Sequence, residues 1–120
     1  MTSSDYSKSL IALACWRAAQ TDLPMVMLAV CMVFRNRAEA GETDLYEVAT
    51  RWLAENPGNF PDLRDPKFLQ LLSNLDSVTS GMVADKTGGA LWFIPTDQLK
   101  PDMLTAFSIT TTIGGLSFVK

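Results

Sequence analysis

An uninterrupted apolar run, PMVMLAVCMVF, occupies residues 24–34 and restricts the fold more than any other segment. A helix with no polar side must be covered by other elements all round. The run is too short for a bilayer, which needs about 20 apolar residues. Pro24 suits the first helical turn, and Gly41 suits the position after the last turn. We therefore expect a buried central helix that ends near Ala40.

Three further segments can surround this central helix, because their apolar residues recur at helical spacing. They are residues 5–20, residues 44–55 and the segment that begins at Asp65 and Pro66, a start signal for a helix. The residues expected to face the core in the last two segments are Leu45, Val48, Ala49, Trp52, Leu53, Phe68, Leu71, Leu72 and Leu75.

The last third of the sequence has strand signals instead. DKTGGALWFIP, from Asp85, predicts a loop that leads into a strand. FSITTTIGGLSFVK alternates apolar and polar residues around Gly114 and Gly115, which is typical of a β-hairpin. A chain of 120 residues can bury one modest core. We predict a single domain over residues 1–120, α+β and mostly α, with a buried central helix and a short C-terminal β-hairpin.

The composition excludes several kinds of site. The chain has no histidine, which rules out Ser-His-Asp and Cys-His catalysis and the common zinc sites that use histidine. The net charge is −3 and the basic residues are scattered, so no basic stripe indicates nucleic acid. No metal or cofactor site is evident in the sequence. The N-terminal MTSSDYSKSL lacks the features of a secretory signal, so we expect synthesis in the cytoplasm and no membrane span.

The two cysteines, Cys15 and Cys31, both lie in apolar helical runs. Their spacing matches neither a metal knuckle nor a redox CxxC pair. Two interpretations remain: buried inert thiols, which we favour, or a disulfide between two helices.

Three segments together are similar to one family. LACWRAAQTDLPMVMLAVCMVFRNR resembles an opening pattern of an aromatic residue, a short E-A-x-G-E run, an apolar helix and a closing Asn-Arg, with Trp16, Ala19, Asp22 and 36–37 at the matching positions. DKTGGALWF resembles the pattern D-x-T-G-G-A-x-x-F, and TTTIGGLSFVK resembles a closing Ile-Gly strand followed by Phe. These are the patterns of the SleB-type cell wall hydrolases, and they occur in the family's order over most of the chain.

The resemblance implies a small lysozyme-like domain that cleaves the β-1,4-linked N-acetylmuramic acid and N-acetylglucosamine strands of peptidoglycan, as a muramidase or a lytic transglycosylase. The chain departs from the family pattern at decisive positions. The family's essential glutamate falls at Ala18, its two histidines fall at Ile94 and Leu116, and the glycine of its opening run falls at Thr21. Ala18 therefore marks the expected catalytic position, without its acid.

No other carboxylate is an obvious replacement for the missing general acid, which must protonate the leaving oxygen. Asp22 is the nearest in sequence, but we favour a helix N-cap for it over a weak catalytic role. Asp85 is expected to be a turn residue that can border the groove. Glu39 and Glu42 are expected to be solvated at a helix end.

The resemblance and the residue types give a candidate substrate-binding set. The glycine pair at 88–89 and the threonine before it have two interpretations. They can form a simple tight turn, or their backbone amides can line the groove. We expect Trp92 and Phe93 to divide between the groove and the core, because alternate strand residues face opposite sides, and we expect Trp52 in the core. The candidate set is Trp16, Phe60, Thr87, Gly88, Gly89 and Trp92.

Three explanations of Ala18 stay open: an engineered inactivation, a natural protein that binds glycan without cutting it, or a chance resemblance. The leading prediction is peptidoglycan cleavage impaired by Ala18. The alternative is a non-catalytic peptidoglycan-binding protein or a phage or secretion-system interaction protein. Either form of wall binding requires release or export by a route other than a signal peptide.

Overall fold

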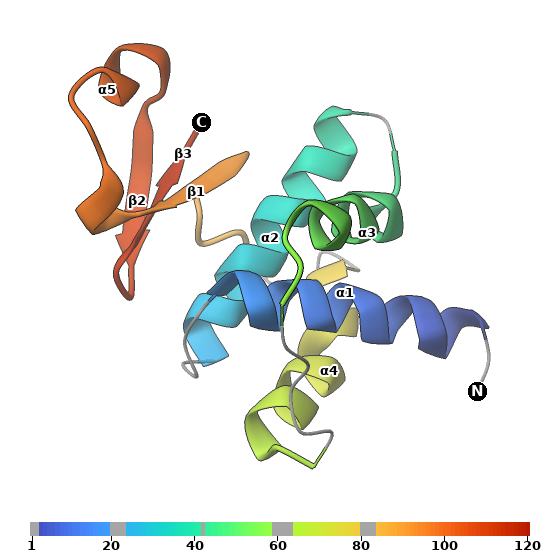
Figure 1. Cartoon of the computed structure of the whole chain (residues 1–120). Helices are drawn as coiled ribbons and strands as arrows, with labels where there is room; N and C mark the ends of the chain where they lie inside the picture. The colour runs from blue at the N-terminus through green and yellow to red at the C-terminus, as the bar shows by residue number, and fades with distance from the viewer. Residues whose placement is uncertain (1–2, 20–23, 42, 59–63, 80–83) are drawn as a thin grey trace.

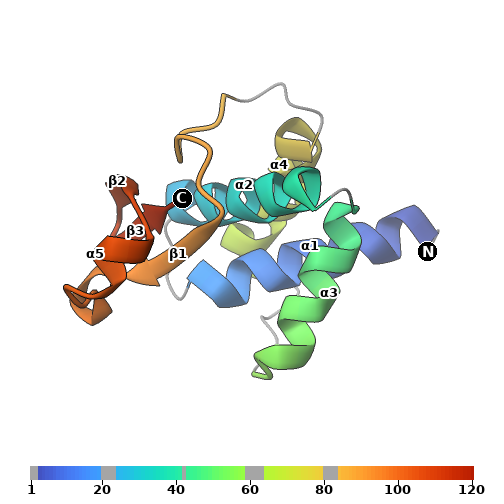
Figure 2. The same ribbon diagram turned by 90° about the horizontal axis from the view of Figure 1, so that it is seen from above.

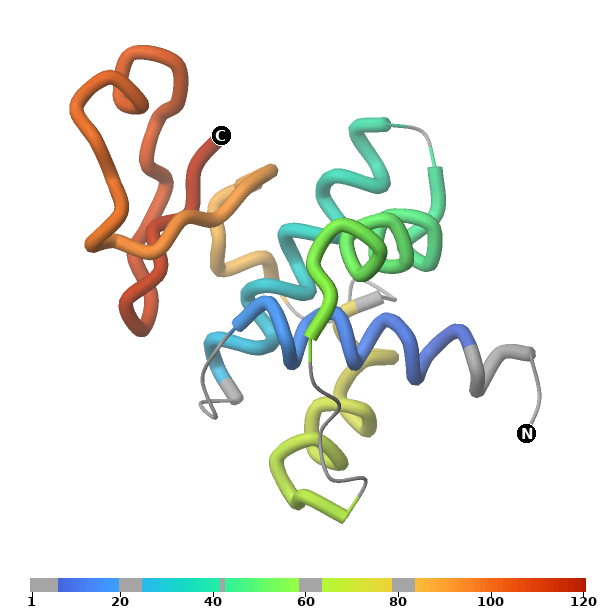
Figure 3. Tube along the Cα trace, viewed as in Figure 1, coloured from blue at the N-terminus to red at the C-terminus, as the bar shows by residue number. Residues whose placement is uncertain are grey.

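A computed structural model describes residues 3–19, 24–41, 43–58, 64–79 and 84–120 of the chain. The first part forms helices, and a small sheet with short helical turns follows; Figures 1 and 3 show the sheet and α5 to one side of helices α1–α4. The elements are α1 (Ser3–Ala19), α2 (Pro24–Ala40), α3 (Leu45–Glu55), α4 (Pro66–Thr79), β1 (Trp92–Pro95), the 3-10 helix η1 (Thr96–Gln98), α5 (Met103–Ala106), β2 (Ile109–Ile113) and β3 (Leu116–Val119). The predicted α+β, mostly α class is confirmed.

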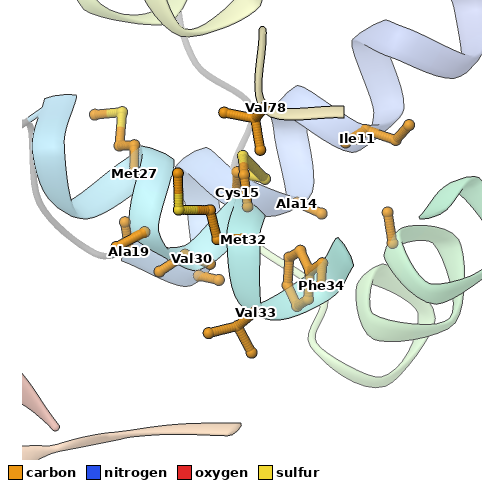
Figure 4. Close-up of a cluster of buried hydrophobic side chains, with 14 of the residues drawn as sticks. Ile11, Ala14, Cys15, Ala19, Met27, Val30, Met32, Val33, Phe34 and Val78 are labelled. Atoms are coloured by element: carbon orange, nitrogen blue, oxygen red, sulfur yellow. A yellow bond between two sulfur atoms is a disulfide. The ribbon is translucent and has the colours of Figure 1, made fainter. Parts of the chain in front are cut away.

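Helix α2 is the central helix, as its composition predicts. It contacts α1, α3 and α4, and Figure 2 shows α4 crossing behind it. Its side chains Met27, Val30, Val33 and Phe34 are fully buried, and each such burial stabilises the fold by about 1.5–3 kcal/mol. Figure 4 shows these side chains gathered with residues of α1 and α4.

The helix boundaries follow the local signals in the sequence. The Asp44 carboxylate caps α3 by accepting a hydrogen bond from the backbone N–H of Glu47 at 2.7 Å. The Asp65 carboxylate accepts one from the backbone N–H of Lys67 at 2.9 Å, at the start of α4. Helix α2 begins at Pro24, where a proline loses no hydrogen bond.

Cys15 of α1 and Cys31 of α2 form a disulfide, with their Cα atoms 5.5 Å apart. The favoured expectation of two free buried thiols is therefore wrong, and the alternative is correct. Both side chains are fully buried in the contact between α1 and α2, and the bond shows that they face each other across it. Sequence spacing does not reveal which faces of two helices meet.

The sheet has three antiparallel strands in the order β1-β3-β2. The predicted hairpin is present, and its turn residues Gly114 and Gly115 have φ of 56° and 85°, which suit glycine. Leu116 and Phe118 of β3 belong to the same buried cluster as the helices, so the sheet and the helices share one core.

The ring of Phe34 joins the two parts of the molecule. Its centroid lies 5.9 Å from the Trp52 ring of α3 and 6.1 Å from the Phe93 ring of β1. Within the described ranges, the helices are too short or too polar for a membrane crossing.

Candidate functional site

A hollow of about 340 Å³ lies where the helices meet the sheet. Helices α1, α2 and α3 supply one wall, and β1, β3 and η1 supply the other. The lining residues are Ala18, Arg37, Trp52, Asn56, Trp92, Phe93, Pro95, Gln98 and Leu116.

Ala18 lies next to the last residue of α1 and lines this hollow with 5% of its surface exposed. Its methyl group therefore borders both the core and the hollow. Among the described residues that line the hollow, the side chains are apolar, aromatic, amide or guanidinium, and none is a carboxylate. The hollow can bind through stacking and hydrogen bonds, but these residues supply no general acid.

Aromatic residues stand on both walls of the hollow. Trp92 of β1 is 42% exposed, and its ring centroid lies 5.2 Å from that of Phe107. Phe93 is half-buried and packs towards Phe34, but it also lines the hollow, so the two neighbours are not divided strictly between groove and core. Trp52 of α3 packs against the core as expected, and it also lines the hollow, which the sequence did not indicate.

Arg17 holds the end of α1 beside the segment that follows α3. Its guanidinium donates hydrogen bonds to the backbone carbonyls of Asn56 at 3.3 Å and Gly58 at 3.0 Å. A Cβ added to Gly58 would lie 3.2 Å from the Arg17 side chain, so the approach is close. This bracing keeps the Asn56 side of the hollow next to the helix end that carries Ala18.

The turn at Thr87, Gly88 and Gly89 is a structural unit, and none of its residues lines the hollow. Thr87 is fully buried, and its backbone N–H and hydroxyl donate to the Asp85 carboxylate at 2.8 and 2.6 Å. The backbone N–H of Gly89 donates to the other Asp85 oxygen at 3.0 Å. These residues form a tight turn in which the backbone N–H groups of Thr87 and Gly89 already have an internal acceptor.

Asp85 is the turn residue that the sequence indicates. Partial burial by itself would raise the pKa of its carboxyl, but hydrogen bonds from Thr87, Asn36 and the backbone N–H groups of Thr87 and Gly89 outweigh this effect. The net result is a pKa below the ordinary aspartate value, so the group is a stable anion and a poor proton donor.

Asn36 connects α2 to this turn. Its side-chain amide donates to the Asp85 carboxylate at 2.9 Å and to the backbone carbonyl of Ala90 at 3.0 Å. Two of the motif segments, the Asn-Arg at the end of the apolar helix and the D-x-T-G-G-A turn, therefore touch. Asn36 sets the position of the turn, and its neighbour Arg37 lines the hollow.

Of the expected substrate-binding residues that the structure describes, only Trp92 lies with Ala18 at the hollow. Trp16 is half-buried and packs against the core cluster, so it does not line the hollow. Asp22 and Phe60 lie outside the described residues. The lining residues that the sequence did not single out for binding are Arg37, Trp52, Asn56, Pro95, Gln98 and Leu116.

In the described part of the chain, no three His, Cys, Asp or Glu side chains are placed to share a metal ion. No family model, curated protein or solved structure matches the chain.

Proposed function

We propose that the chain binds peptidoglycan glycan strands in the hollow at the junction of helices and sheet, and that it does not cleave them because Ala18 stands where a general acid is needed. The observation that carries this proposal is the position of Ala18, which borders a hollow with aromatic residues on both walls.

The lining of the hollow matches the chemistry of a sugar chain. Tryptophan rings such as those of Trp52 and Trp92 can stack on the apolar faces of pyranose rings. The amides of Asn56 and Gln98 can exchange hydrogen bonds with hydroxyl and N-acetyl groups. The volume of about 340 Å³ is at the low end for ligand sites, which suits one segment of a strand that continues into solvent.

The same lining accounts for the absence of turnover. Glycoside cleavage requires a carboxylic acid beside the leaving oxygen, and the described lining residues contain none. A carboxyl at position 18 would be largely withdrawn from water, because the alanine there is only 5% exposed. Such burial raises the pKa of a carboxyl towards neutral pH, which is the condition a general acid needs.

The disulfide between Cys15 and Cys31 also supports the proposal that the protein functions outside the reducing cytosol. Disulfides form and persist in oxidising environments, such as those of secreted and surface proteins, and are rare in the cytosol. A protein that works at the cell wall meets such conditions, whichever route takes it there.

Binding is tested by sedimentation with purified, insoluble peptidoglycan. Trp92→Ala is expected to weaken binding about tenfold, which corresponds to the loss of one aromatic stacking contact. Tyr46→Ala is the matched control, because Tyr46 is an exposed aromatic residue of α3 that does not line the hollow. Equal sedimentation of the wild type, Trp92→Ala and Tyr46→Ala, or no sedimentation of the wild type, would refute the proposal.

The catalytic part is tested by Ala18→Glu. We expect this variant to clear a peptidoglycan suspension at least about 100-fold faster than the wild type, the lower range for a general acid. Ala18→Gln is the control, since it has nearly the same shape and cannot donate a proton as an acid. If both variants are folded and neither clears the suspension, position 18 is not a vacant catalytic position, and the binding function stands alone.

A further inference from the structure

We propose that the hollow continues into a second subsite that binds a carboxylate of the ligand, with Arg37 as its counter-ion. This inference rests on the proposed function and adds a charge preference to it. Arg37 lines both the hollow at Ala18 and a neighbouring hollow of about 310 Å³ along α3 and the C-terminal end of α2.

The two hollows are adjacent parts of one surface. Arg37 and Trp52 line both of them, so a ligand that stacks on Trp52 lies near Arg37 in either hollow. The first hollow supplies mainly aromatic and amide groups, whereas the second has the charged residues Arg37, Glu47, Arg51 and Glu55 in its lining. An extended ligand would therefore contact mainly aromatic and amide groups in the first hollow and charged groups in the second.

Two of the charged residues that line the second hollow form an ion pair with each other. Arg51 forms an ion pair with Glu47 at 2.9 Å, and the Thr43 hydroxyl also donates a hydrogen bond to Glu47. Among the residues that the structure describes, Arg37 and Glu55 have no side-chain ion pair or hydrogen bond. The positive charge that remains for a ligand in this hollow is that of Arg37.

Other arginines whose contacts are described have their partners within the chain. Arg17 binds two backbone carbonyls, and Arg35 pairs with Glu39 at 3.3 Å on the same helix as Arg37. Arg37 is half-buried, lines both hollows and has no ion-pair partner in the described part of the chain. A guanidinium presents a planar fork of donors that fits a carboxylate with two parallel hydrogen bonds, so a carboxylate is the ligand group that this position suits.

Glu55 limits the kind of anion that fits. Its carboxylate lines the same hollow and repels a second negative charge placed there. A ligand with a single carboxylate pairs with Arg37, and a ligand that also has an ammonium group satisfies both Arg37 and Glu55. Peptidoglycan offers a carboxylate from two sources: the lactyl group of muramic acid where no peptide is attached, and the stem peptide where it is.

The test compares three soluble ligands by isothermal titration of the intact wild-type protein. They are the neutral chitotetraose, an N-acetylglucosamine–N-acetylmuramic acid tetrasaccharide with free lactyl carboxylates, and the same tetrasaccharide with stem peptides. We expect at least one acidic ligand to bind about tenfold more tightly than chitotetraose, as one charge-assisted contact allows. Tightest binding of the lactyl form or of the peptide form identifies the source of the carboxylate.

Arg37→Gln is expected to remove this preference, so that the ratio of the dissociation constants for neutral and acidic ligands falls to about one. Arg35→Gln removes a paired guanidinium of the same helix, away from both hollows, and should keep the wild-type ratio. In the wild type, salt at about 0.5 M should also reduce the preference through screening, a readout that needs no variant.

The outcomes separate the two proposals. Equal binding of all three ligands by the wild type overturns the carboxylate subsite and leaves the glycan-binding proposal intact. An Arg37→Gln variant that keeps the wild-type ratio also overturns the subsite. Failure of the wild type to bind any of the three ligands refutes glycan binding and, with it, this inference.

Discussion

Reduction of the Cys15–Cys31 disulfide should lower the free energy of unfolding by about 3 kcal/mol, because the bond closes a loop over a sequence separation of 16 and so restricts the unfolded chain. For a chain of 120 residues, each kcal/mol corresponds to about 4 °C in Tm, so we expect the reduced protein to melt about 12 °C lower. The native contacts of both buried sulfur atoms remain, so the loss comes mainly from the unfolded state.

The assay is thermal unfolding followed by circular dichroism, with and without a phosphine reductant, together with thiol titration in denaturant to confirm the redox state. The double variant Cys15→Ala/Cys31→Ala is the control, since its Tm should not respond to the reductant. A fully reduced wild type that melts within about 3 °C of the oxidised protein would refute the entropic reasoning. Free thiols in protein purified without reductant would contradict the disulfide itself.

Three further substitutions concern two turns: Asp85 and Gly88 belong to one, and Gly115 belongs to the β2–β3 hairpin. Asp85→Asn should cost about 2 kcal/mol at pH 7 by weakening the hydrogen bonds that the carboxylate accepts. Because folding lowers the pKa of Asp85, its stabilisation is present above the ordinary aspartate pKa and is lost as pH falls through the folded value. Urea unfolding should therefore show the wild type approaching Asp85→Asn below about pH 4, and a constant gap between pH 7 and pH 3 would contradict this. Gly115→Ala should cost about 1 kcal/mol, since φ is 85° there and the added Cβ meets nothing within 4 Å. Gly88→Ala should cost about 1 kcal/mol more in the same assay, because its Cβ would also lie 3.2 Å from that of Thr110, and equal costs would show that this contact relaxes freely.

Local signals in the sequence predicted most of the fold. Pro24, Asp44 and Asp65 start helices because their effect depends only on neighbouring backbone groups. The hairpin at Gly114 and Gly115 is likewise a local feature, and the uniform apolarity of residues 24–34 was enough to place α2 at the centre.

The features that escaped prediction depend on contacts between distant segments. The Cys15–Cys31 bond and the approach of Asn36 to Asp85 both require knowing which faces of the elements meet. For the same reason the sequence placed Ala18 and Trp92 in the candidate site but did not single out Arg37 and Trp52, which lie on separate helices. Residue identity suggests what a side chain can do, and only the packing decides which side chains act together.

The strand order has a consequence for when the hollow can form. β3 is the last of the three strands in the sequence, but it lies between the other two in the sheet. Neither β1 nor β2 therefore has a hydrogen-bonded partner strand until Leu116–Val119 is in place. During synthesis, the helical wall can assemble from early contacts, whereas the opposite wall waits for the last of three strands and for the pairing of β1 with β3, which closes a longer loop than the β2–β3 hairpin does. A nascent chain that stops after β2 would therefore have a packed helical part and no completed binding surface.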